Sequence, residues 1–468
     1  MQKSFFFQLI EQHDSYHEKQ ITNRRFKYEQ ILPFIESLQL DKRFKTTKVG
    51  NSYLDKPLYK IEWGNGSKVV LMWSQMHGNE PTATKAFLDI WKFLSADDHF
   101  NDLRNQFFEQ LKLVFIPVLN PDGTNLFQRR TFQGIDMNRD AIKLQTPEAR
   151  ILKNLIFEYK AEFGFNLHDQ SPFYSAGNTS FPAVISFLAP AFNEIKEIND
   201  IREKAMKMIA LMNKDLQELL PNHIGKYDDT YNQRAFGDNI QKWGISTILI
   251  ESGGYHHDPD KEYIRKLNFA LLLRCFEAIC SEEYTTFSIE EYNSIPYNVK
   301  DNFCDLIIRN AVYEKNGVSY KIDIAVNRNE VEYNSHKNYY FESKIIDIGD
   351  LSQLNGYEEI DANGMQITRG KPYPYIFSDH NEAQNADFEK ILKNGYTSIE
   401  IEEHASFEKY THLPINMKQE GTEEEPIDMD YSADFLLVEE KEVINTIVNG
   451  FVINYQKDNF GVLNALVY

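Results

Sequence analysis

The stretch Lys68–Leu94, which reads KVVLMWSQMHGNEPTATKAFLDIWKFL, joins a nearly continuous apolar run to an amphipathic segment. The run Lys68–Gln75 is typical of a strand that is buried on both faces. The segment Pro81–Leu94 begins with proline and carries apolar residues at helical spacing, so it predicts a helix. The residues between them, Met76–Glu80, turn the chain where the strand ends. The stretch therefore predicts a strand–turn–helix unit of an α/β sheet.

Strand and helix patterns alternate on both sides of this unit. Further apolar runs occupy Leu111–Asn120, Phe163–His168 and Ile245–Glu251, and helical periodicity marks residues 1–40 and Lys261–Cys280. Strands that are apolar on both faces need a layer of helices on each side. We therefore predict an α/β domain over residues 1–285, with a mixed, mostly parallel sheet covered by helices on both faces.

The overall composition indicates a folded protein of two domains. The 468 residues exceed the length of one ordinary domain, and 42% hydrophobic residues are enough for a sizeable core. The net charge of −20 argues against nucleic acid and against acidic membrane surfaces as partners. No apolar run reaches the roughly 18 residues that a membrane-spanning helix needs.

Cysteine usage and the N-terminal stretch favour a cytoplasmic protein. Cys275, Cys280 and Cys304 have no paired spacing, so we expect free thiols in a reducing compartment. The first residues, MQKSFFFQLIEQHDSYHEKQ, lack the apolar core and the small-residue cleavage site of a signal peptide.

Polar residues follow the ends of three predicted strands. His77 and Glu80 lie in the turn after the first strand, while His168 and Glu251 end two others. The ends of such strands converge at one edge of an open sheet. Two imidazoles and one carboxylate are a typical ligand set of catalytic zinc, which keeps a fourth position open for water. We expect His77, Glu80 and His168 to bind the metal, and Glu251, partly desolvated at its strand end, to act as the general base.

A lone His-x-x-Glu pair is more often structural, and the ordered set of segments is what favours a metal site. These segments are MHGNE, NPDG, GIDMNRD, FNLHDQ and ILIESGG. Their order resembles the zinc carboxypeptidases of the A/B type over roughly residues 25–280. The resemblance implies one zinc ion per chain on the same three ligands, with Glu251 as the base.

The resemblance also implies how a substrate is held. Asn138 and Arg139 would bind the terminal carboxylate of a peptide, and Arg129 would polarise the scissile carbonyl. Tyr231 lies near the place of the family's mobile tyrosine, across a gap of one residue. The chain departs from the family pattern at Thr131, where an asparagine often follows the arginine by two positions.

Several neighbouring residues are open to other roles. His256–His257 are adjacent, so we expect them at the rim rather than on one ion. We expect Asp169 to be a loop-end carboxylate, with the alternative that it orients a ligand or the cleft loop. We expect Tyr227–Asp229 to belong to a mobile loop above the site. Asp238 and Phe236 lie in the segment that forms the specificity pocket of the resembled family. An acid there would favour basic side chains and an aromatic lining would favour apolar ones, so both preferences stay open.

The character of the sequence changes after residue 280. We expect the acidic, aromatic stretch Ser281–Asn298 to link two domains. Short alternating segments broken by Asn, Gly and Asp predict a β-rich accessory domain over residues 286–468. Lys344–Gly370 and Ala433–Asn454 faintly resemble the β-sandwich beside amidohydrolase barrels, but no barrel fits between them. Three roles stay open for this domain: covering an edge of the cleft, forming a homo-oligomer or binding a partner.

These patterns predict a zinc-dependent metallocarboxypeptidase that hydrolyses C-terminal residues from peptides. Its partner would be a peptide or small amide with a free carboxylate, which the tandem Asn138–Arg139 could read by directional, charge-assisted hydrogen bonds. Two alternatives stay open. One is a zinc amidase or deacylase of small N-acyl amino acids, and the other is a non-catalytic protein that binds peptide ends on the same fold.

Overall fold

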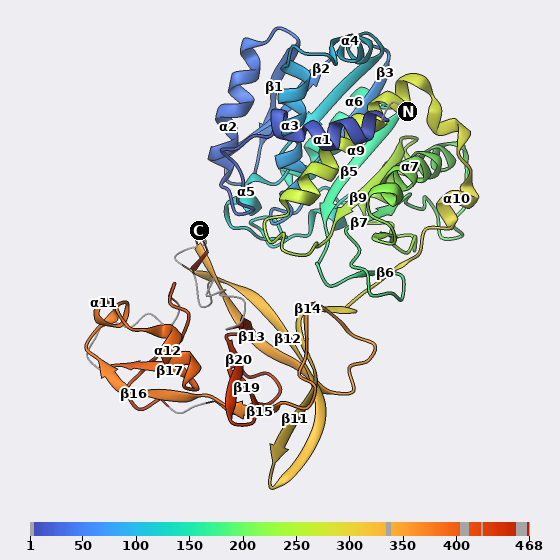
Figure 1. Cartoon of the computed structure of the whole chain (residues 1–468). Helices are drawn as coiled ribbons and strands as arrows, with labels where there is room; N and C mark the ends of the chain where they lie inside the picture. The colour runs from blue at the N-terminus through green and yellow to red at the C-terminus, as the bar shows by residue number, and fades with distance from the viewer. Residues whose placement is uncertain (1–3, 334–337, 403–410, 423–424, 455–465, 468) are drawn as a thin grey trace. The chain divides into compact units, whose positions relative to one another are not determined.

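The computed structural model describes residues 4–333, 338–402, 411–422, 425–454 and 466–467 (Figure 1). The chain divides into two compact units, Met1–Asp301 and Asn302–Tyr468, which are treated separately below. Within the described residues, no helix combines the length and the apolar character that crossing a membrane requires.

The first unit is built on an eight-stranded sheet. In spatial order its strands are β1 (Phe44–Asn51), β2 (Pro57–Trp63), β4 (Leu111–Ile116), β3 (Lys68–Trp73), β5 (Phe163–Asp169), β9 (Ser246–Ser252), β7 (Ile185–Leu188) and β8 (Ile224–Lys226). The central strands β4, β3, β5 and β9 run parallel to one another. The pairs β1–β2, β2–β4 and β7–β9 are antiparallel, and β8 is parallel to β7. The predicted mixed sheet is confirmed, and the apolar runs of the sequence mark its parallel centre.

Helices cover both faces of this sheet, as predicted. One apolar core joins the sheet to α1 (Phe5–Tyr16), α2 (Tyr28–Ser37), α3 (Thr82–Ser95), α4 (Asn101–Gln110), α7 (Asp200–Leu219) and α9 (Glu262–Ser281). A second core joins it to α6 (Pro147–Tyr159) and α8 (Phe236–Lys242). Strand β5 alternates between the two sides: Phe163, Phe165 and Leu167 belong to the first core, so the residues between them face the other way. Shorter elements are η1 (Leu38–Leu40), α5 (Pro121–Asn125), η2 (Met137–Arg139) and β6 (Ser175–Ala176).

The carboxyl ends of β3, β5 and β9 lie at one edge of the sheet, because these strands are parallel neighbours. In the β5–β9 ladder His168 is the partner of Glu251. The chain leaves β3 after Trp73 and enters α3 at Thr82, so the turn that carries His77 and Glu80 lies at the same edge. The fold therefore gathers at one edge the residues on which the expected chemistry depends.

The stretch Ser281–Asn298, which we expected to link the domains, instead packs onto the first unit. It forms η3 (Glu283–Thr286), α10 (Ile289–Asn293) and the start of β10 (Asn298–Val299), and β10 pairs with β6. Tyr284, Tyr292 and Ile295 are buried in the core that includes α7 and α9. The physical reason is that the acidic residues of this stretch alternate with aromatic and apolar ones, which give it a face to bury.

The second unit is β-rich, as predicted. Its main sheet contains β11 (Phe303–Lys315), β12 (Val318–Tyr333), β13 (Asn338–Gly349), β14 (Asn355–Asp361), β15 (Gln366–Arg369), β19 (Phe435–Glu439), β20 (Glu442–Val448), β21 (Phe451–Asn454) and β22 (Leu466–Val467). A smaller parallel sheet contains β16 (Lys371–Phe377), β17 (Tyr396–Ile401) and β18 (Asn416–Gln419), accompanied by α11 (His380–Ala383) and α12 (Phe388–Lys393). Each sheet has its own apolar core.

Candidate metal centre

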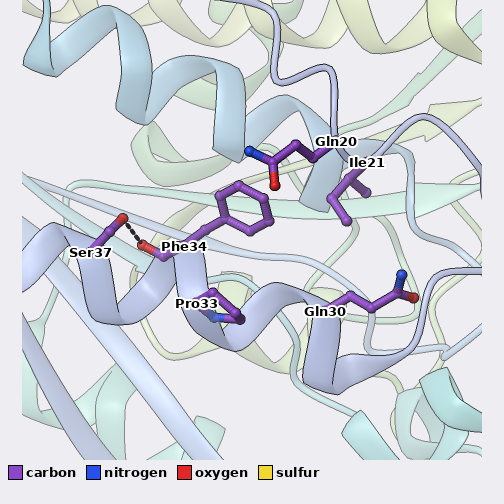
Figure 2. A pocket seen from close by; sticks show the side chains of 6 residues that line it. All are labelled: Gln20, Ile21, Gln30, Pro33, Phe34 and Ser37. Carbon is purple, nitrogen blue, oxygen red and sulfur yellow. Dashed lines mark hydrogen bonds between the residues drawn. The ribbon is translucent and has the colours of Figure 1, made fainter.

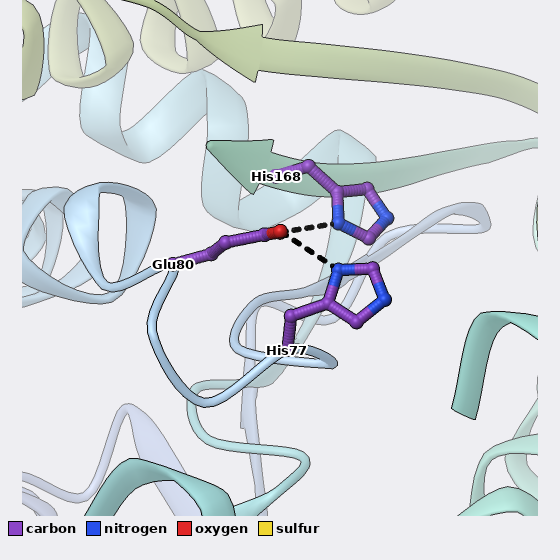
Figure 3. Close-up of side chains that lie close together, drawn as sticks. All are labelled: His77, Glu80 and His168. Carbon is purple, nitrogen blue, oxygen red and sulfur yellow. Dashed lines mark hydrogen bonds and ion pairs between the residues drawn. The ribbon is translucent and has the colours of Figure 1, made fainter. Parts of the chain in front are cut away.

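Three buried side chains converge at the edge of the sheet where β3 and β5 end (Figure 3). Glu80 lies between two imidazoles: its Oε1 is 2.8 Å from Nδ1 of His77, and its Oε2 is 2.6 Å from Nδ1 of His168. One ligand atom of each residue lies within 4.8 Å of the other two. In the part of the chain that the structure describes, this is the one group of three or more such side chains that could hold a metal ion.

The turn that presents His77 and Glu80 is held by the NPDG segment. Asn120 is the N-cap of α5, where its side chain accepts a hydrogen bond from the backbone N–H of Gly123 at 2.9 Å. Its amide also donates to the carbonyl of Met76 at 3.4 Å. Gly78 packs so closely on α5 that an added Cβ would lie 2.0 Å from the carbonyl carbon of Gly123. NPDG therefore has the structural role that its turn residues suggest, and the metal loop needs glycine at position 78.

The donor set fits a zinc ion. Two imidazole nitrogens and one carboxylate are ligands that zinc uses when a fourth position is kept for water. Burial would raise the pKa of Glu80, but the adjacent His77 and His168 outweigh it and hold the pKa far below its usual range. Burial lowers the pKa of His77, whereas Glu80 and Asp136 raise it more. The site thus holds a carboxylate and two imidazoles in a buried place. A bound divalent cation would stabilise this arrangement.

Asp136 is a member of the site that we did not assign from the sequence. Its Oδ1 lies 3.1 Å from Nε2 of His77, and this contact helps to orient the imidazole so that its Nδ1 faces Glu80. The same carboxylate accepts the backbone N–H of Asn138 at 2.9 Å and faces Nε of Arg129 at 3.2 Å. Burial opposes ionisation, but His77 and Arg129 hold the pKa of Asp136 well below its usual range. The only signal in the sequence is its position two residues before Asn138.

Glu251 lies beside the three ligands but is not one of them. It is half-buried at the end of β9, opposite His168. Burial raises its pKa to about 8, against the opposing effect of His168. A carboxyl with a pKa near neutrality can both take and give a proton, which suits a general base that later acts as an acid.

Tyr227, which we expected in a mobile loop above the site, is the first residue of the loop that follows β8. It is half-buried, and its N–H donates to the carbonyl of Phe187 at 2.9 Å. Its ring centroid lies 5.7 Å from that of Tyr174. Burial, the nearby Glu251 and Tyr174 raise the pKa of its hydroxyl, so it stays protonated beside the base. Tyr231 lies four residues further on and is half-buried in the segment before α8.

Arg129 lies in the loop before η2 and Arg139 is the last residue of η2, and their partners differ. Arg129 forms ion pairs with Glu80 and Asp136, each at 3.2 Å, while its side chain stays 46% exposed. Arg139 donates to the carbonyl of Asn138 at 2.6 Å. Among the described residues it forms no ion pair with Asp136 or Asp140, the two acids beside it in the sequence. Its charge therefore remains available to an anionic group of a substrate.

The segment after Tyr231 contacts η2, the element that ends with this arginine. The backbone N–H of Phe236 donates to the side-chain oxygen of Asn138 at 2.9 Å, which joins η2 to the start of α8. Phe236 itself is fully buried in the second core. Asp238 accepts the N–H of Asn232 at 2.8 Å, and burial raises its pKa to about 6. His256 and His257, which we expected at the rim, are exposed beyond β9.

A separate hollow lies between α2 and the preceding loop (Figure 2). It is lined by Gln20, Ile21, Gln30, Pro33, Phe34 and Ser37. None of the three metal-site side chains contributes to its lining, so it is not part of the candidate metal centre.

Comparisons with known proteins agree with the donor set. The zinc carboxypeptidase family model matches residues 31–214, which include His77, Glu80 and His168. Carboxypeptidase 2 of Trichophyton tonsurans is 30% identical over 173 residues, covering 35% of this chain and 31% of that protein. Gamma-D-glutamyl-L-diamino acid endopeptidase 1 of Lysinibacillus sphaericus is 32% identical over 114 residues, covering 22% of this chain and 28% of that protein.

The chain therefore spans less than a third of the length of these curated relatives. Among solved structures, carboxypeptidase A from Helicoverpa armigera is 13% identical, with a TM-score of 0.44 over 60% of this chain and 80% of that one. The part of this chain that is similar to the zinc carboxypeptidase family is thus residues 31–214.

Proposed function

We propose that the first unit is a zinc-dependent metallocarboxypeptidase, which hydrolyses C-terminal residues from peptides. The observation that carries this proposal is the convergence of Nδ1 of His77, Nδ1 of His168 and the carboxylate of Glu80, with Glu251 beside them. A zinc ion on these three residues would lower the pKa of a water molecule to about 7 and polarise the scissile carbonyl.

Glu251 would take the proton of the attacking water and pass it to the leaving amine. Its partly buried position supports this role, because a carboxylate that is costly to keep ionised is a stronger base and takes a proton from water more readily. Arg129 would donate to the oxygen on which negative charge develops. It now contacts Glu80 through Nη1 and Asp136 through Nε and Nη2, and a guanidinium has five N–H donors in all.

Arg139 and Asn138 would hold the terminal carboxylate of the peptide. The absence of an ion pair between Arg139 and Asp136 or Asp140 in the described residues supports this role, because a guanidinium already paired would bind a substrate less well. The side-chain oxygen of Asn138 is used by Phe236, which leaves its amide N–H groups to donate. A site that reads a chain end in this way would act on peptides from the C-terminus.

The decisive experiment compares a blocked dipeptide with the same dipeptide amidated at its C-terminus. We expect hydrolysis of the free acid only, with activity lost in a chelator and restored by zinc. Equal hydrolysis of both substrates would instead favour an amidase that does not read the carboxylate. Hydrolysis of small N-acyl amino acids in preference to peptides would favour a deacylase, and zinc binding without cleavage of any peptide would favour a binding protein.

We further propose that the protein works in the cytoplasm on peptides rather than on nucleic acid or membranes. Its cysteines, two of them buried, form no disulfide among the described residues, and the net charge is −20. Fractionation of cells that express the full chain would test the compartment. Recovery in an oxidising compartment with the thiols paired would contradict it.

A further inference from the structure

A buried lysine touches the ends of the two strands that carry His168 and Glu251. Lys261 precedes α9 and is only 7% exposed. Its Nζ donates to the carbonyl of Ser252 at 2.8 Å and to the carbonyl of Gln170 at 3.2 Å. Ser252 directly follows Glu251 on β9, and Gln170 lies two residues after His168. One ammonium group thus joins β5 and β9 just beyond their functional residues.

The same ammonium also reaches the start of α3 through Asp169. Oδ2 of Asp169 lies 3.6 Å from Nζ of Lys261 and accepts the hydroxyl of Thr82 at 2.6 Å. Thr82 is the first residue of α3, two residues after Glu80. The backbone N–H of Asp169 donates to Oε2 of Glu80 at 3.3 Å. The contacts therefore connect the segments that present His168, Glu80 and Glu251.

The β5–β9 ladder needs such a link at this position. Its last pairs are His168 with Glu251 and Asp169 with Ser252, and the N–H of Gln170 donates to the carbonyl of Ser252 at 3.0 Å. Beyond these bonds the two strands separate into different loops, so small movements at their ends would change the distance from His168 to Glu251. An ammonium has three N–H donors, and here two carbonyls and one carboxylate surround it.

We propose that Lys261 is a positioning residue for the metal centre, an inference that rests on the proposed zinc-dependent function. Its cation fixes the ends of β5 and β9 and, through Asp169 and Thr82, the start of α3. His168, Glu80 and Glu251 are thereby kept at the separations that one divalent ion and its water require. Groups that orient ligands in this way commonly change metal affinity 10- to 100-fold when they are removed.

The competing explanation is that Lys261 merely begins α9 and supports the fold. A matched control separates the two. Lys60 on β2 is 8% exposed, and its Nζ contacts Glu158 at 2.7 Å and the hydroxyl of Tyr159 at 2.6 Å. It is also a buried lysine of the first unit, but it contacts no residue of the metal centre. Methionine at either position keeps the length of the side chain and removes its charge and donors.

The test measures the zinc dissociation constant of the full chain by competition with a chromogenic chelator. We expect Lys261→Met to weaken zinc binding roughly 10- to 100-fold, and Lys60→Met to change it less than about threefold. With zinc saturating, Lys261→Met should lower kcat for a free-acid peptide more than it changes KM, because Lys261 does not touch the substrate. Equal zinc affinity in wild type and Lys261→Met would overturn the inference.

Two milder variants keep the inference testable if Lys261→Met does not fold. Lys261→Arg retains the charge. Thr82→Val removes only the hydroxyl that donates a hydrogen bond to the carboxylate of Asp169. We expect both to bind zinc several-fold more weakly than wild type, with unchanged affinity in both variants counting against the inference. A wild type that binds no zinc would defeat the proposed function itself. A wild type that binds zinc as tightly as every variant would defeat only the role of Lys261.

Discussion

Replacing Glu251 by glutamine should abolish turnover while leaving the metal ligands in place. Glu251 is not among the three residues whose ligand atoms converge, so Glu251→Gln should retain zinc. Glutamine cannot take a proton from water, and the loss of a general base typically slows a reaction about 10²- to 10⁴-fold. We therefore expect a drop of this size in kcat with an unchanged zinc content.

The same substitution should stabilise the metal-free protein at alkaline pH. Burial raises the pKa of Glu251 from its usual 4.5 to about 8. Below pH 4.5 the carboxyl is protonated in both the folded and the unfolded protein, so the two proteins should be equally stable there. As the pH rises toward 8 the unfolded chain releases this proton first, and the stability of the wild type falls. The penalty is at most on the order of 4–5 kcal/mol, and the neutral glutamine does not incur it.

Thermal unfolding of the two metal-free proteins at pH 5 and pH 9 tests the sign. We expect similar midpoints at pH 5 and, at pH 9, a midpoint for Glu251→Gln that is higher by up to roughly 10 °C. Glu148→Gln is the matched control, because Glu148 is a fully buried carboxyl whose pKa burial also raises. It should show the same trend with pH but retain turnover. The reasoning would be refuted if Glu251→Gln melted no higher than wild type at pH 9, or if it kept near-native activity.

Three further substitutions test other contacts. Asp136→Asn removes the negative partner of His77 and should weaken zinc binding about 10- to 100-fold in chelator competition, whereas unchanged affinity would show that the imidazole is oriented without it. Arg139→Ala should raise KM for free-acid peptides roughly 10- to 100-fold with less effect on kcat, and an unchanged KM would place carboxylate recognition elsewhere. Arg265→Met leaves the fully buried Asp89 without its bidentate partner and should lower the free energy of unfolding by about 3–5 kcal/mol in denaturant melts. Adding Asp89→Leu should restore part of that loss, and no recovery would show that the buried charge is not its cause.

Most of the fold and the three candidate ligands could be predicted from local patterns. The ligands stand out because His77, Glu80 and His168 directly follow or end apolar runs, and the ends of parallel strands meet. The carboxylate of Asp136 was missed as a partner of His77, since the two residues are 59 positions apart and no periodicity relates them. Ser281–Asn298 was read as a linker for a similar reason, because the residues that bury its aromatic side chains lie far away in the chain.

By itself, then, the sequence determined where strands, turns and helices begin, because hydrophobic period and turn chemistry are properties of neighbouring residues. It also determined which polar groups stand at the strand ends. Only the tertiary structure decided which distant groups meet there: Asp136 on His77, Tyr227 beside Glu251, and Lys261 across the ends of β5 and β9. Such contacts depend on strand register and on how loops pack, and they leave no local pattern in the chain.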